Sequence, residues 1–229
     1  NPHLYSPNQM FAREMLYEGL VDLGENGGIV PALAERWEVS ADGLEYRFHL
    51  RSGVSFSDGE PFDADVVVKN FTAIMENAKR HAWLPLTEKI ENFHSQGPST
   101  FILRLKSPYY PVLDDLALPR PFRMLSPAAF PDDGKTRTGI KKAVGTGPWK
   151  LSKTALGEYD LFERNENYWG EKAKEAKVLV RVIPDPQSRS VALETGEIDL
   201  IYGIGQISYY AFSRFRSDAK YVTAVSTPV

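Results

Sequence analysis

Strand-like alternation of apolar and polar residues is the clearest pattern in this chain. Between 38 and 50 the alternation continues on both sides of an Ala-Asp-Gly turn, which predicts a β-hairpin with Tyr46, Phe48 and Leu50 on one face. A second strand pair is predicted around a Gly-Pro turn. The other predicted strands are short, and the last of them is expected to be buried. The strands after the hairpin are 88–93, 100–106, 150–151, 159–163, 177–183 and 199–201.

Helical spacing of apolar residues alternates with these strands. The predicted helices are 10–21, 64–77, 108–116 and 185–195. Asp63 is a suitable N-cap for the second helix, and Gly196 suits the left-handed position after the last one. Pro119, Pro121 and Pro127 predict an irregular extended segment, because proline cannot continue a helix or donate to a sheet.

The order of these elements indicates the fold class. Strands and helices mix without a regular βαβ repeat, which predicts an α/β protein of the mixed α+β kind. A length of 229 residues allows one large domain or two small ones. No internal repeat and no Gly/Ser/Pro-rich linker divides the chain.

Composition excludes several classes of function. The net charge of −3 provides no general basic field for nucleic acid or anionic lipid, so no nucleic-acid partner is expected. The chain has no cysteine, which excludes thiol catalysis, cysteine-based zinc sites and disulfides. No apolar run has the length of a membrane span, and no signal peptide is expected within these residues. The chain begins at Asn1 without an initiator Met, as a trimmed or mature segment would.

Four motifs occur in a fixed order along the chain. They are P-A-L-A-E-R-W at 31–37, F-H-L-R-S-G-V-S-F-S-D-G-E-P-F at 48–62, G-T-G-P-W at 145–149 and E-T-G-E-I-D-L at 194–200. In residues, order and spacing they resemble the extracytoplasmic solute-binding protein family of peptide- and nickel-type ABC importers. Four further segments resemble the nickel-type members in particular: 1–10, 80–84, 109–123 and 164–172.

The resemblance implies a fold and a domain organisation. Members of this family fold as two lobes, and the chain resembles the first: a periplasmic-binding-protein-like lobe with a mixed β-sheet and flanking helices. Within 1–229 the resemblance implies a cleft-forming sub-domain of 1–30 plus 165–229 and an inserted sub-domain of 31–164. The chain is therefore expected to be a fragment from which the second lobe is absent.

The resemblance also implies a function. It indicates the substrate-binding component of an ABC importer, located in the periplasm, which captures nickel held by a small carboxylate or amino-acid chelator. The expected partners are this metal chelate and the importer permease in the membrane, and the parent protein is expected to be a monomer. No enzymatic activity and no catalytic cofactor are expected. The alternatives are a dipeptide-, oligopeptide- or haem-binding protein of the same family, and a hydrolase or transferase acting on small acidic molecules.

Carried over position by position, the resemblance points to five ligand-binding residues: Tyr5, Met10, Arg80, Trp83 and Arg120. Their chemistry suits a chelator, since a guanidinium binds a carboxylate with two parallel hydrogen bonds and an indole offers a flat wall. Other interpretations stay open. Met10 and Trp83 are residue types that pack in cores, while Arg80 and Arg120 suit surface ion pairs.

The remaining polar motifs favour structural roles. His3, His49, His81 and His94 do not pair at helical spacing, so no protein metal ligand is predicted, and His49 is expected to face outward. The adjacent carboxylates at 114–115 and 132–133 are expected on the solvated surface. Residues 145–148 lack the Lys and Ser/Thr of a phosphate loop, which predicts a turn that serves packing.

Overall fold

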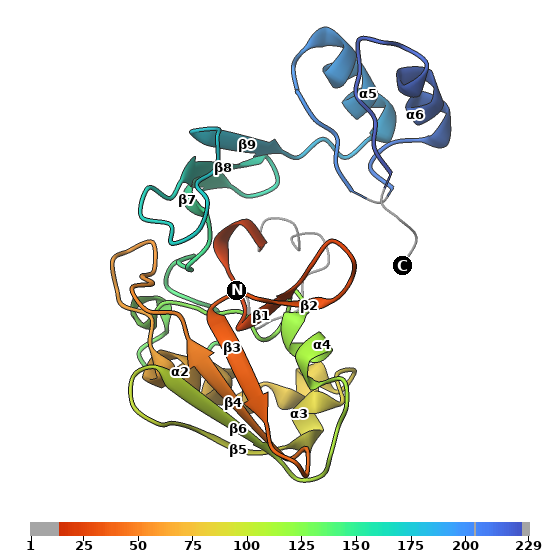
Figure 1. Cartoon of the computed structure of the whole chain (residues 1–229). Coiled ribbons are helices and arrows are strands. Elements are labelled where there is room, and N and C mark those ends of the chain that lie inside the picture. The colour runs from red at the N-terminus through yellow and green to blue at the C-terminus, as the bar shows by residue number, and fades with distance from the viewer. Residues whose placement is uncertain (1–13, 204, 226–229) are drawn as a thin grey trace. The chain divides into compact units, whose positions relative to one another are not determined.

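The computed structural model describes residues 14–203 and 205–225, and the chain divides into two compact units. Unit 1 comprises the residues up to Lys153 together with Leu161–Val178, and unit 2 comprises Thr154–Asp160 and the residues from Leu179 onward. Groups of strands and groups of helices follow one another along the chain (Figure 1). The mixed α/β class is confirmed, and the strands of the described residues belong to three sheets. The division into the sub-domains 1–30 plus 165–229 and 31–164 stays a prediction.

A four-stranded antiparallel sheet forms the centre of unit 1. Its order is β3 (Ala34–Val39), β4 (Glu45–Leu50), β6 (Thr100–Leu105) and β5 (Ile90–Ser95). The predicted alternation in β4 is confirmed, because Tyr46, Phe48 and Leu50 are buried. The strand predicted at 88–93 begins two residues later, since its first residues belong to the short helix α3 (Leu86–Lys89).

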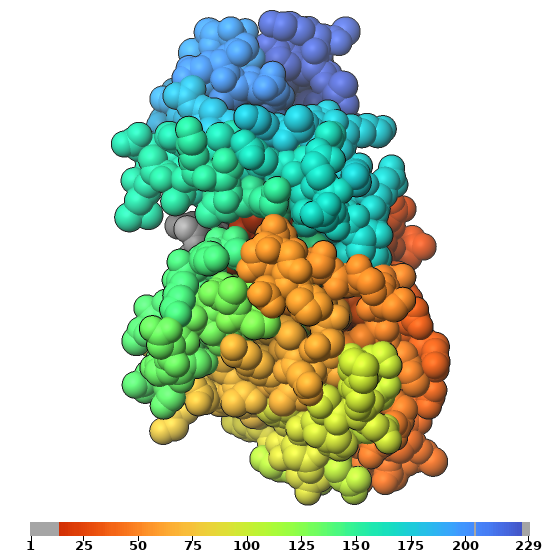
Figure 2. Space-filling view, turned by 90° about the vertical axis from the view of Figure 1, so that its left-hand side faces the viewer, coloured from red at the N-terminus to blue at the C-terminus, as the bar shows by residue number. Residues whose placement is uncertain are grey.

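Helix α2 (Ala64–Glu76) lies along one face of this sheet (Figure 1). Asp63 is its N-cap, as predicted, and accepts a 2.9 Å hydrogen bond from the Val66 backbone N–H. Phe71 is fully buried, and its ring centroid lies 4.7 Å from that of Phe101 and 5.1 Å from that of Phe122. In Figure 2 the gold surface of α2 adjoins the yellow-green surface of β5 and β6. The aromatic cluster of Phe71, Phe101 and Phe122 thus joins helix α2, the sheet and the segment after α4 (Val112–Ala117).

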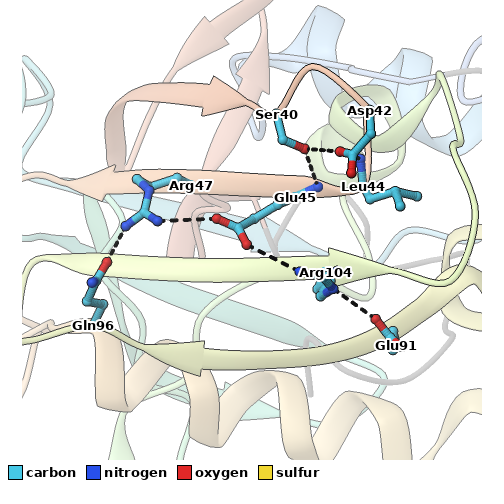
Figure 3. Close-up of polar contacts among 8 residues, drawn as sticks. All are labelled: Ser40, Asp42, Leu44, Glu45, Arg47, Glu91, Gln96 and Arg104. Carbon is cyan, nitrogen blue, oxygen red and sulfur yellow. Dashed lines mark hydrogen bonds and ion pairs between the residues drawn. The ribbon is translucent and has the colours of Figure 1, made fainter.

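The other face of the sheet carries a row of charged side chains (Figure 3). Glu45 lies between Arg47, at 3.2 Å, and Arg104, at 3.7 Å, and Arg104 also donates a 3.1 Å hydrogen bond to Glu91. Arg47 in turn donates to Gln96. These pairs are partly exposed, so they fix cross-strand neighbours but contribute little to the free energy of unfolding.

The helix predicted over 10–21 is wrong in its second half. Only its residues from 14 onward are described; residues 14–16 are helical, and β1 (Val21–Leu23) already begins at Val21 and pairs with β2 (Ile29–Pro31). Backbone carbonyls between residues 16 and 20 accept hydrogen bonds from distant segments and not from N–H groups of a following helical turn. The Leu16 carbonyl accepts from the Gly147 N–H at 3.0 Å, and the Leu20 carbonyl accepts from the Ala34 N–H at 2.8 Å. Tertiary pairing therefore overrides the helical pattern.

The glycine turn at 145–148 has the packing role that was predicted. A Cβ on Gly145 would lie 2.0 Å from the Leu16 carbonyl oxygen, and one on Gly147 would lie 2.6 Å from the Met15 carbonyl oxygen. The Asn165 amide closes this contact by donating to the Gly147 carbonyl at 3.0 Å. Glycine is needed here because two backbone segments touch.

The second half of the chain contains a three-stranded sheet and two helices. The sheet has the order β7 (Trp149–Ala155), β8 (Tyr159–Arg164) and β9 (Lys177–Arg181), and the helices are α5 (Pro186–Thr195) and α6 (Tyr209–Arg216). Gly196 ends α5 in the left-handed conformation, as predicted, with φ of 76°. The prediction of a buried strand at 199–201 is wrong: these residues form no strand, and Leu200 is 70% exposed. Helix α6 was not predicted.

Candidate ligand-binding site

Two of the predicted ligand-binding residues lie in contact. Trp83 follows the 3₁₀ helix η2 (Ala78–His81) and precedes α3, whereas Arg120 follows α4 (Val112–Ala117). The structure brings them together, with the Cζ atom of Arg120 4.5 Å from the centroid of the Trp83 ring. Trp83 remains 48% exposed, so it is not a core residue. A cation over an indole at this distance is attracted by the negative face of the ring, which holds both groups in place.

The turn that carries Trp83 is held by hydrogen bonds within its own segment. The Leu84 N–H donates to the His81 carbonyl at 2.8 Å, and the Thr87 hydroxyl donates to the Leu84 carbonyl at 2.9 Å. Leu84 and Leu86 are buried on the two sides of Pro85. The two buried leucines anchor the turn. The indole of Trp83, which lies in sequence between η2 and Leu84, remains partly exposed to solvent.

The segment that carries Arg120 is fixed on its C-terminal side. Phe122 belongs to the aromatic cluster, and Arg123 is buried with its Nη2 atom donating to the Ala117 carbonyl at 2.9 Å. The Met124 N–H donates to the Glu18 carbonyl at 2.9 Å. Prolines at 119 and 121 restrict the backbone on both sides of Arg120, so little conformational entropy remains to be lost on binding.

The other three predicted residues have separate outcomes. Arg80 is exposed in η2, where its Nη1 atom is 3.4 Å from the Arg137 carbonyl, and both residues line a cavity of about 460 Å³. Tyr5 and Met10 lie outside the described residues. Ligand contact by any of the five therefore stays a prediction.

A second cavity in unit 1, of about 410 Å³, was not predicted. Its lining includes three carboxylates at four-residue spacing, Glu14, Glu18 and Asp22, together with Arg123 and Tyr168. Pro119, next to Arg120 in sequence, also lines it. The four-residue spacing of the acids was visible in the sequence, but it is also the spacing of an exposed helical face, which made it uninformative.

Glu18 is the most constrained carboxylate of this cavity. Its two oxygens accept hydrogen bonds from the Tyr168 hydroxyl and the Trp169 indole N–H, both at 2.8 Å. Burial raises the pKa of Glu18, although these hydrogen bonds oppose the shift. Burial raises the pKa of Glu14 as well, against the attraction of Arg123. The arrangement ties the residues before β1 to the Asn-Tyr-Trp-Gly turn at 167–170.

The histidines lie apart from one another and in different environments. His81 is fully buried, His49 pairs with Glu38 at 3.0 Å, and His94 is exposed. Within residues 14–203 and 205–225 no group of three or more His, Cys, Asp or Glu side chains could hold a metal ion. Over the same residues no helix combines the length and the apolar character that a bilayer crossing requires.

The described residues thus form a mixed α/β structure in which Arg120 and Trp83 lie in contact. In the comparison with family models, the model for the middle part of the bacterial extracellular solute-binding proteins, family 5, matches residues 28–226. The chain belongs to this family.

Individual relatives are similar over most of the chain. The nickel-binding periplasmic protein of Escherichia coli (strain K12) is 49% identical over all of this chain and 44% of its own length. NikA from Brucella suis, solved in complex with Fe(III)-EDTA, is 51% identical with a TM-score of 0.91, over 95% of this chain and 44% of that one. NikZ from Campylobacter jejuni, solved in complex with Ni(L-His), is 30% identical with a TM-score of 0.75, over 86% and 39%. This chain therefore spans less than half the length of these relatives.

Proposed function

We propose that this chain is the ligand-contacting part of a periplasmic binding protein that captures nickel as a chelate. The observation that carries the proposal is the contact between Arg120 and Trp83, since both residues belong to segments that resemble the nickel-type members. Arg120 binds a carboxylate of the chelator, and Trp83 covers an apolar part of it. Tyr5, Met10 and Arg80 supply further contacts. Relatives solved with Fe(III)-EDTA and Ni(L-His) support a chelated metal as the ligand.

Electrostatics favours the chelate over the bare ion. A guanidinium is always charged, so Arg120 repels a bare divalent cation and attracts a complex whose carboxylates give it negative charge. Charge-assisted hydrogen bonds from arginine to carboxylate are the strong ones, and the planar fork also selects the geometry of its partner. The protein thus recognises the chelator, and the metal enters with it.

Delivery needs a second surface and a membrane partner. The chain covers 44% of the nickel-binding relative's length, and good pockets bury about 70–90% of a small ligand. We therefore propose that the site closes between two lobes, that ligand binding favours the closed state, and that a monomeric closed protein delivers the chelate to an ABC importer permease. No enzymatic step is part of this proposal.

The test is calorimetric titration of the natural protein that carries this chain. Ni(II) with L-histidine and Fe(III)-EDTA are expected to bind, whereas Ni(II) without a chelator and a dipeptide without metal are expected to bind far more weakly. The bound chelator is expected to be recovered chemically unchanged. Tighter binding of the dipeptide would instead support the peptide-binding alternative, and a chemically altered chelator would support an enzyme.

A histidine variant separates the chelator mechanism from direct metal coordination. His81 is fully buried, so His81→Ala is expected to lower the free energy of unfolding through the cavity it leaves. Its affinity for the chelate, measured well below the unfolding temperature, should stay close to that of the wild type. Loss of binding in His81→Ala together with normal binding in Arg120→Ala would overturn the proposal.

A further inference from the structure

The loop that presents Arg120, residues 117–123, is closed by the side chain of its last residue. The Nη2 atom of Arg123 donates a 2.9 Å hydrogen bond to the carbonyl of Ala117, the last residue of α4. The Arg123 backbone N–H also donates to the Pro121 carbonyl at 2.9 Å. Because Arg120 lies in sequence between Ala117 and Arg123, these two bonds hold the backbone on both sides of it.

The same guanidinium ties this Arg120 loop to strand β1. The Nη2 atom of Arg123 is 3.5 Å from Oδ1 of Asp22, and the Arg123 side chain is only 3% exposed, whereas that of Asp22 is 49% exposed. A charge enclosed by protein is unfavourable unless an opposite charge and hydrogen-bond acceptors compensate for the lost water. The buried position of Arg123 therefore favours the arrangement in which both of these partners are in place.

The Ala117 carbonyl is a fixed anchor because α4 is packed into unit 1. Ala117 and Leu116 are buried. Asp115 is buried as well, so the prediction that both carboxylates at 114–115 are solvated is wrong for the second of them. Its Oδ2 atom accepts a 3.0 Å hydrogen bond from the Tyr109 hydroxyl, which compensates for the lost water.

A cavity borders the Arg120 loop. Asp22, Ala117, Pro119 and Arg123 all line the cavity of about 410 Å³. Atoms that face a cavity lack packing contacts on that side, so packing alone holds them less firmly. The polar contacts of Arg123 therefore carry more of the task of fixing the loop than they would in a filled core.

We infer that Arg123 is a positioning residue that holds the Arg120 loop between α4 and β1 and so keeps the Arg120 guanidinium in the geometry that binds the chelate. The inference rests on the proposed function, in which Arg120 contacts the ligand. Arginine suits the task because one terminal nitrogen carries two hydrogens and can serve a carbonyl and a carboxylate at once. Arg123 itself contacts no ligand in this role.

Substitutions at 123 test the inference by titration of Fe(III)-EDTA into the natural protein that carries this chain. Arg123→Met keeps the apolar part of the side chain but removes its donors, and should weaken binding by about fivefold. Arg123→Lys keeps a charged donor and should recover part of the loss. Circular dichroism and thermal unfolding establish which variants are folded, and Arg123→Lys and Asp22→Ala carry the test should Arg123→Met fail to fold.

An arginine that closes a different loop of unit 1 provides the matched control. The Nη1 atom of Arg164 donates to the carbonyls of Ala173 and Lys174, both at 3.1 Å, and its Nε atom donates to Glu166 at 2.9 Å. Arg164→Met thus removes the same kinds of contact and should lower stability, but should leave the affinity within about twofold of the wild type. An equal loss of affinity in both methionine variants would overturn the positioning role.

Asp22→Ala distinguishes positioning from a direct effect of charge on the ligand. Removing a negative charge near the site would strengthen binding of an anionic chelate if charge acted through space. Positioning predicts the opposite: loss of the Asp22 carboxylate loosens Arg123, so binding of Fe(III)-EDTA should weaken by about twofold to fivefold. Stronger binding in Asp22→Ala would overturn the inference.

A double-mutant cycle with Arg120 completes the test. If Arg123 acts through Arg120, then Arg123→Met should cost less than about twofold in an Arg120→Ala background. Equal losses in both backgrounds would overturn the positioning role. So would normal binding in Arg123→Met together with weak binding in Arg120→Ala, an outcome that leaves the proposed function intact. A wild-type protein that binds no chelate would overturn the function itself.

Discussion

The Arg120 guanidinium lies over the Trp83 indole ring, with 4.5 Å between Cζ and the ring centroid. The two residues belong to separate segments, one before α3 and one after α4, and each segment is held independently. A preformed pair of this kind lowers the entropy that a ligand would otherwise lose on ordering an arginine side chain.

Arg120 is expected to contribute more to chelate binding than any other described residue. Hydrogen bonds to charged groups contribute about 1.5–3 kcal/mol each, so Arg120→Ala should weaken binding at least about tenfold. Arg120→Lys should recover only part of the loss, because an ammonium cannot reproduce the planar fork. Isothermal titration with Fe(III)-EDTA measures both. Arg36→Ala, which removes a largely exposed arginine, serves as the control, and a loss there equal to that in Arg120→Ala would indicate a nonspecific charge effect.

Trp83 is expected to contribute through contact area and through its hold on Arg120. Trp83→Ala should weaken binding less than Arg120→Ala, while Trp83→Phe should retain part of the affinity because a phenyl ring still offers an aromatic face. Combining Trp83→Ala with Arg120→Ala should cost less than the sum of the two changes, since each removes the partner of the other. Strict additivity in titration would contradict a functional contact between the two residues.

Glu18 is expected to make stability depend on pH. Burial raises its folded-state pKa above the ordinary value of 4.5, so the stabilisation from this group is fully present below 4.5 and is lost as pH rises through the raised pKa. Glu18→Gln has no such group to titrate. The difference in free energy of unfolding, Glu18→Gln minus wild type, should therefore grow from about pH 4 toward pH 8 in urea titrations.

Glu38 offers a control of opposite sign. Hydrogen bonds from His49 and Arg36 hold the pKa of this exposed carboxyl below its usual value, so its stabilisation is present above the ordinary value and lost as pH falls through the lowered one. The corresponding difference for Glu38→Gln should become more negative as pH rises. Curves of the same sign for both variants would show that burial of Glu18 does not govern the effect.

Gly145→Ala should destabilise the protein strongly. The new Cβ would lie 2.0 Å from the Leu16 carbonyl oxygen, which is backbone and has little freedom to move. Overpacking in such a place costs about 1–3 kcal/mol or more, and thermal unfolding should show a clear fall in Tm. Gly28→Ala, where nothing lies within 4 Å of the new Cβ, should change stability by less than about 0.5 kcal/mol. A normal Tm for Gly145→Ala would show that the two segments do not touch.

Much of the local structure could be predicted from the sequence. The hairpin that buries Tyr46, Phe48 and Leu50, the Asp63 cap of α2 and the Gly196 end of α5 all agree with the structure. Each depends on residues close together in sequence, where periodicity, capping and the conformational freedom of glycine decide the outcome. The family is likewise confirmed from motifs that are contiguous in the chain.

Other features were decided only by the tertiary structure. The apolar stretch at 199–201 forms no strand in the described chain, and the helical pattern before Val21 gives way to pairing with Ala34 and Gly147. A strand or a helix end depends on which other segment supplies hydrogen bonds, and that segment can be far away in sequence.

The candidate site shows the same division. The sequence by itself determined which residue types were available for a chelate, namely Arg120 and Trp83 in segments of the nickel-type resemblance. Only the tertiary structure decided that the guanidinium meets the indole, and that Asp115 is enclosed while Asp114 is not. Neighbours in sequence can face opposite environments, and residues far apart can touch, because side-chain contacts depend on how the segments pack in three dimensions.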